Sequence, residues 1–105
     1  MKTNKQVVVT LTRSGLKLGL KIYNNLDKMD LYIPQKFKKE VAKGERSQFF
    51  YYDFPLKELT AELFDEYSYI IYIMSLGIVV RITAPYLKNK RIDPAVVTID
   101  EAGQN

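Results

Sequence analysis

Residues 69–85 read YIIYIMSLGIVVRITAP and give the clearest indication of the fold class. Its first six residues are β-branched, aromatic or otherwise apolar and carry no charge, which is typical of a strand buried on both faces. Residues 75–77 then turn the chain, and the apolar segment 78–84 predicts a short helix that Pro85 ends or kinks. A buried strand followed at once by a helix indicates a parallel α/β architecture.

The same alternation of strands and helices extends outward along the chain. We expect four core strands near residues 6–12, 30–33, 69–74 and 95–99, and helices near residues 15–26, 55–67 and 77–87. Ser14 is the expected N-cap of the first helix. The segments 35–48 and 49–54 have no clear period, the first Lys-rich and the second aromatic. The pattern predicts a single domain over residues 1–105 with a three-layer α/β/α fold. Its mainly parallel sheet would have four to five strands, as in flavodoxin-like or Rossmann-like folds.

The composition excludes several classes of protein. The chain has no cysteine and no histidine, which rules out disulfide scaffolds, thiolate or imidazole metal sites and a His-based catalytic triad within these residues. No segment reaches the roughly 18–20 apolar residues of a membrane-spanning helix, and no signal peptide is evident. We therefore expect a cytoplasmic protein that does not enter a membrane.

The formal net charge of +4 has two interpretations. Lysines such as Lys36, Lys38 and Lys39 can keep a surface solvated, or they can attract a polyanion such as a carboxylate-rich metabolite. The aromatic run 49–54 beside them could stack single-stranded nucleic acid, but no nucleic-acid motif accompanies it. Part of the core or a partner surface is the favoured interpretation, and no nucleic-acid partner is predicted.

Ligands of such sheets bind beyond the carboxyl ends of the strands. Two segments at that edge also open helices, whose N–H groups suit an anion, so we predict substrate-binding roles for Arg13, Ser14, Gly15, Ser75 and Gly77. The alternative is that the two glycines only make tight turns. Neither segment matches a dinucleotide or P-loop motif, so no nucleotide site is predicted.

Three charged residues are further candidates for the site. Arg81 lies about one turn into the apolar helix, where it could pair with Asp93 or Asp100 or bind a substrate carboxylate. Asp100 and Glu101 follow the last strand and are the candidate catalytic acid or base, although their spacing alone favours a solvated turn.

Dense local patterns accompany these candidates: MSLGIVVR at residues 74–81, APYLKNK at 84–90, DPAVV at 93–97 and DEAG at 100–103. Together they resemble the N-terminal domain of the CbiG family of cobalt-precorrin-5A hydrolases, which act in cobalamin (vitamin B12) biosynthesis. Weaker agreement covers residues 14–16, 32–34 and 54–59.

The resemblance implies a specific reaction and substrate. The family opens the δ-lactone of cobalt-precorrin-5A and releases acetaldehyde. The substrate is a tetrapyrrole fringed with carboxylates, and because it carries the cobalt itself, no cofactor and no protein metal site are expected. In the family, an SGHxGGAN segment and a further domain follow the DExG turn, whereas this sequence stops at Asn105. The missing part of the same protein, or a partner subunit, is therefore an expected partner, and the chain by itself is expected to be inactive.

Two other functions stay open at this point. One is a non-catalytic module that binds a corrinoid or another polyanionic metabolite and delivers it to a partner. The other is a structural or dimerisation domain, which would make a homodimer.

Overall fold

In the computed structural model, residues 5–26, 28–41, 48–88 and 93–100 are described. These residues form one five-stranded sheet in the order β3-β2-β1-β4-β5, and every neighbouring pair of strands is parallel. The strands are β1 Gln6–Thr10, β2 Met29–Pro34, β3 Phe49–Tyr52, β4 Tyr69–Ile73 and β5 Ala95–Ile99. The predicted three-layer α/β fold is confirmed.

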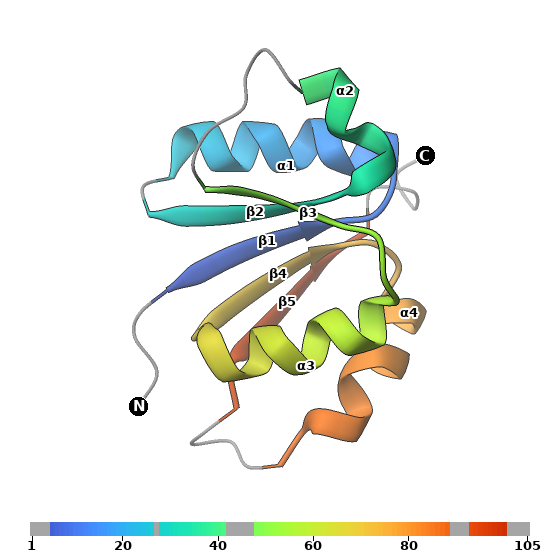
Figure 1. Cartoon of the computed structure of the whole chain (residues 1–105). Coiled ribbons are helices and arrows are strands. Elements are labelled where there is room, and N and C mark those ends of the chain that lie inside the picture. The colour runs from blue at the N-terminus through green and yellow to red at the C-terminus, as the bar shows by residue number, and fades with distance from the viewer. Residues whose placement is uncertain (1–4, 27, 42–47, 89–92, 101–105) are drawn as a thin grey trace.

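Helices cover both faces of this sheet (Figure 1). The helices α1 Arg13–Asn25 and α2 Lys38–Val41 lie on one face, and α3 Leu56–Glu66 and α4 Leu76–Thr83 lie on the other. Short 3-10 helices, η1 Gln35–Phe37 and η3 Ala84–Tyr86, follow β2 and α4. This distribution follows from right-handed crossovers, because β1 connects to β2 in one direction and β3 connects across to β4 in the other.

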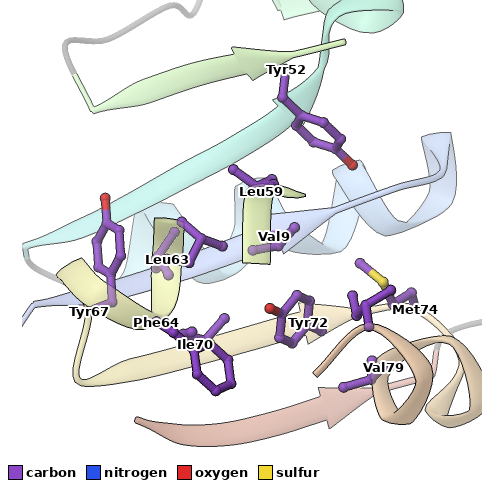
Figure 2. Close-up of a cluster of buried hydrophobic side chains, with 12 residues drawn as sticks. Val9, Tyr52, Leu59, Leu63, Phe64, Tyr67, Ile70, Tyr72, Met74 and Val79 are labelled. Carbon is purple, nitrogen blue, oxygen red and sulfur yellow. The ribbon is translucent and has the colours of Figure 1, made fainter. Parts of the chain in front are cut away.

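Alternate residues of each strand divide the core into two apolar clusters. Val7 and Val9 of β1 face the α3 and α4 side, where Tyr67, Ile70 and Tyr72 are also buried (Figure 2). Val8 faces the α1 and α2 side. Helix α1 approaches β1 closely because Gly19 has no side chain, and a Cβ there would lie 2.7 Å from Cγ2 of Thr10.

The differences from the expected elements are local. The first strand ends at Thr10 and not near residue 12, and the third predicted helix ends at Thr83 before the 3-10 turn that contains Pro85. The aromatic run 49–54, left without an assigned structure, contains the fifth strand β3. Phe49 and Tyr52 are buried there, while Phe50 is exposed and stacks on Tyr32 of the neighbouring strand at 5.2 Å, so the run is partly core and partly surface.

Within the described ranges, no helix combines the length and apolar character needed to cross a membrane.

Two isoleucines of β4 that differ in burial lead to a stability prediction. Ile73 has no exposed surface, and Ile73→Ala should lower the free energy of unfolding by about 2–5 kcal/mol because it leaves a cavity. Ile71 lies on the same face but is only partly buried, so Ile71→Ala should cost roughly half as much or less. Urea denaturation followed by circular dichroism measures both changes. Equal losses at the two positions would contradict the packing described here.

Candidate functional site

The carboxyl edge of the sheet is where three helices begin. Helix α1 follows β1, α3 follows β3 and α4 follows β4, so the N-termini of these helices lie at the same edge (Figure 1). Strands β1 and β4 are neighbours, and Thr10 pairs with Ile73 at their ends. The connections from these two strands leave toward opposite faces, which makes this the topological switch point at which ligands of open α/β sheets bind.

The structure brings the predicted segments to adjacent strand ends. Residues 12–15 follow β1, residues 75–77 follow β4, and Asp100 follows β5. Ile73 pairs with Thr10 on one side and with Ile99 on the other, so these three strand ends are in register. Glu101 lies outside the described residues.

Thr12, and not the predicted Ser14, is the N-cap of α1. The backbone of Thr12 is extended, and its Oγ1 accepts a hydrogen bond from the Gly15 N–H at 3.0 Å. Ser14 is exposed, and its Oγ lies 3.3 Å from Oγ1 of Thr12. Both Thr12 and Ser14 carry a hydroxyl that could cap α1. The sequence does not distinguish them, because the N-cap residue must have an extended backbone, and the end of β1 determines which residue has it.

Gly15 lies inside the first turn of α1 and is buried, so the tight-turn interpretation is wrong. A Cβ at this position would lie 3.3 Å from both Cγ2 and the carbonyl oxygen of Ile73. The glycine therefore lets α1 pack closely on the end of β4. Its N–H group, which was predicted to bind substrate, donates a hydrogen bond to Oγ1 of Thr12.

Arg13 is bound to another residue of the protein. Its Nε and Nη2 each donate to a carboxylate oxygen of Glu40 at 3.0 Å, and its guanidinium lies 5.2 Å from the ring of Phe37. This hydrogen-bonded ion pair lowers the pKa of Glu40. Both side chains are largely exposed, so the pair adds little stability, and a substrate carboxylate would have to compete with Glu40 for Arg13.

The start of α4 is open to solvent at Leu76 and Gly77. Ser75 is the N-cap, and its Oγ accepts a hydrogen bond from the Ile78 N–H at 3.4 Å. Leu76 is 61% exposed. Gly77 lies in the first turn of α4 and makes no tight turn, and a Cβ there would meet nothing within 4 Å. A ligand could therefore reach the backbone of this first turn.

Arg81 is exposed on α4, one turn beyond Gly77. Of the two carboxylates considered as its structural partners, that of Asp93 accepts a hydrogen bond from the Lys88 N–H at 2.6 Å. Among the described residues, the salt bridge found joins Arg13 to Glu40 and does not involve Arg81. Asp100 is exposed at the end of β5.

Sequence reasoning missed a pocket at the same edge, beyond β1, β2 and β3. It has a volume of about 270 Å³, and the residues that line it are Leu11, Pro34, Gln35, Lys36, Tyr52, Asp53 and Phe54. The signal was present, because an aromatic run and a proline each end a strand there, but it needed β3 to be recognised as a strand.

Tyr52 forms one wall of this pocket and joins two strands. Its ring reaches from β3 toward β1 (Figure 2), and its hydroxyl donates to the Thr10 carbonyl oxygen at 2.7 Å. Burial raises the pKa of the Tyr52 phenol, so the hydroxyl remains a neutral donor across the physiological range. Thr10 in turn donates from its Oγ1 to the carbonyl oxygen of Tyr32 at 2.8 Å. These bonds fix the pocket wall against the central strand.

Comparisons with known proteins cover most of the chain. The family model described as "Cobalamin synthesis G N-terminal" matches residues 58–105. A protein of Priestia megaterium named cobalt-precorrin-5A hydrolase is 38% identical over 98 residues, which is 93% of this chain and 26% of that protein. A protein of the same name from Salmonella typhimurium (strain LT2) is 48% identical over 44 residues, which is 42% of this chain and 12% of that protein.

The chain thus spans about a quarter of the length of the Priestia megaterium relative. No solved structure matches the chain significantly.

The capping assignment can be tested directly. Thr12→Ala should lower the free energy of unfolding by about 1 kcal/mol, because the Gly15 N–H loses its partner at the start of α1. Ser14→Ala is the matched control and should change stability by no more than about 0.5 kcal/mol. Urea denaturation measures both variants. A larger loss from Ser14→Ala would restore Ser14 as the cap.

Proposed function

Because this chain belongs to the family of cobalamin synthesis G (CbiG) N-terminal domains, we propose that it acts in cobalamin biosynthesis as a substrate-binding part of a cobalt-precorrin-5A hydrolase. The substrate would be a cobalt-precorrin, a tetrapyrrole with an apolar ring system and carboxylates at its rim. The cobalt enters as part of this substrate and not as a cofactor of the protein.

The observation that carries the proposal is the composition of the carboxyl edge. A mainly apolar pocket, with Tyr52 and Phe54 in its wall and Lys36 at its side, opens at the edge where α1, α3 and α4 begin. An apolar ring needs apolar surface, and its carboxylates need N–H donors or cations around that surface. The carboxyl edge of this sheet offers apolar surface in the pocket and N–H donors and cations around it.

The described residues support different roles for the predicted binding residues. The open first turn of α4, with Ser75 and Gly77, is suited to receive one carboxylate, and Arg81 a second. Lys36 would meet a third from the pocket side. Arg13 would contribute only by exchanging Glu40 for the ligand, and Gly15 would act by positioning α1.

For the chemical step we propose hydrolysis of the δ-lactone of cobalt-precorrin-5A. Water would add to the lactone carbonyl and the acyl C–O bond would break, which leaves a carboxylate and a hydroxyl on the two-carbon fragment. This hydroxyl would then lose its proton and become the aldehyde carbonyl as the C–C bond to the macrocycle breaks, so that the electron pair stays with the macrocycle and acetaldehyde departs. Asp100 or Glu101 would accept the proton from water, and N–H groups after Ser75 would stabilise the negative charge on the carbonyl oxygen.

A second function, a non-catalytic corrinoid-binding module, is favoured by one observation. Asp100 is exposed, and an exposed carboxylate does not exclude bulk water from a reacting group beside it. Such a module would bind the macrocycle at the same edge and pass it to another polypeptide. Binding assays cannot separate the two functions, whereas turnover can.

The binding role of the edge can be measured by calorimetry with a polycarboxylated cobalt corrinoid. Binding should weaken as salt rises, because exposed charges are screened. Arg81→Ala should raise the Kd about tenfold through loss of a charge-assisted hydrogen bond.

Lys21→Ala is the control for net charge, since Lys21 is exposed in the second half of α1, away from the carboxyl edge. It should leave the Kd nearly unchanged. If the two substitutions raise the Kd equally, Arg81 acts only through the net charge of the protein. If neither changes the Kd, Arg81 is not part of the binding site.

Turnover is the second test. Residues 1–105 should release no acetaldehyde from cobalt-precorrin-5A under anaerobic conditions, because they contain no histidine and an exposed edge does not exclude water. Joining the chain to the remaining part of the Priestia megaterium relative should restore release, measured by trapping the aldehyde. Efficient release by residues 1–105 would place the whole reaction on this domain, with Asp100 or Glu101 as the base.

A further inference from the structure

One part of the sheet surface has apolar side chains and no helix over it among the described residues. On the side of the sheet that carries α1, strands β4 and β5 present Tyr69, Ile71, Ala95, Val97 and Ile99. Tyr69 and Val97 are each 49% exposed, and Ala95 is exposed as well. We call these five residues the β4–β5 face.

The opposite side of the same two strands is covered. Ile70 and Tyr72 have no exposed surface there, and Val96 packs against the same cluster under α3 and α4. Helix α1 lies over β1 and its neighbours, and it contributes Leu18 and Ile22 to the cluster that Ile71 and Ile99 border. The helical layer that α1 forms thus ends before it reaches β5, and no described helix covers the β4–β5 face.

Parallel sheets are stable when helices cover both faces, and their outer strands are protected from pairing with other chains. Here β5 is the edge strand of the described sheet, and its apolar side chains alternate between a covered and a bare face. A parallel sheet with one face uncovered at its edge favours the packing of a further element on that face.

The dimensions of the β4–β5 face fit one helix. Two strands span about 10 Å, which is the diameter of an α-helix with its side chains. Five residues of strand extend for about 16 Å, the length of roughly eleven helical residues. The resulting area, on the order of 160 Å², is far below the roughly 800 Å² per partner of a stable association between separate proteins. A second copy held by this face is therefore disfavoured, and a helix connected to the domain is favoured, because a tether raises its effective concentration.

The Priestia megaterium relative extends well beyond its alignment with this chain. The matching family model is that of an N-terminal domain, and about three quarters of the Priestia megaterium relative lies outside its alignment with this chain. We propose that the β4–β5 face binds an amphipathic helix from the part of the relatives that follows this domain. The helix completes the layer that α1 begins and holds the rest of the protein beside the sheet.

Cysteine footprinting tests this docking, since the chain has no cysteine of its own. Val97→Cys is introduced into residues 1–105 and into a fusion with the following part of the Priestia megaterium relative, and labelling by a maleimide is followed by mass spectrometry. The cysteine should react rapidly in residues 1–105 and about tenfold more slowly in the fusion, because the centre of an interface excludes solvent.

Val80→Cys is the matched control, because Val80 is a 55% exposed valine on α4, on the other side of the sheet. Its labelling should be the same in both proteins. Equal labelling of Val97→Cys in both proteins, or equal protection of both cysteines, would overturn the proposal.

Protection of Val97→Cys in residues 1–105 that grows with protein concentration would also overturn it, since the occupant would then be a second copy. Circular dichroism checks that each variant is folded. The labelling needs no substrate, so its outcome is independent of whether the domain binds a corrinoid.

Discussion

Burial of β1 on both faces is the constraint on which the rest of this structure depends. Val7, Val8 and Val9 have no exposed surface, although their side chains point alternately to the two sides of the sheet. A strand of this kind must lie in the middle of the sheet and needs a layer of helices above and below it. Right-handed crossovers then send α1 to one side and α3 to the other, and the strand order reverses between β1 and β4.

The position of the candidate site follows from this reversal. Because α1 and α4 leave adjacent strand ends toward opposite faces, neither helix blocks the edge between them. The close seating of Gly15 on Ile73 and the hydrogen bond from Tyr52 to Thr10 hold the flanking walls in place. Rigid strand ends therefore support the pocket and the open first turn of α4, and the proposed binding of a carboxylated ring would depend on this rigidity.

The sequence predicted the strands that have continuous apolar runs and the helices that have a clear apolar periodicity. It could do so because buried positions are occupied mainly by apolar residues. It did not reveal β3, because the run 49–54 joins buried and exposed aromatic residues and so lacks a period of two. It predicted which segments meet at the carboxyl edge, which depends on strand direction. It could not predict that Arg13 pairs with Glu40 or that Thr12 caps α1, since those contacts depend on how α2 and the end of β1 are placed. The roles of Asp100 and Glu101 stay predictions.

The two halves of the chain contribute different parts of the candidate site. The family model matches residues 58–105, which supply β4, the open start of α4 and the bare side of β5, while the pocket is built by residues before them. The candidate binding surface lies at the carboxyl edge, and the apolar surface that no described helix covers lies beside α1, a few residues away along the same two strands. A helix docked on Val97 would be anchored next to the end of β5, where Asp100 stands. Docking there would bring the following polypeptide close to the edge and could supply the enclosure that the described residues lack.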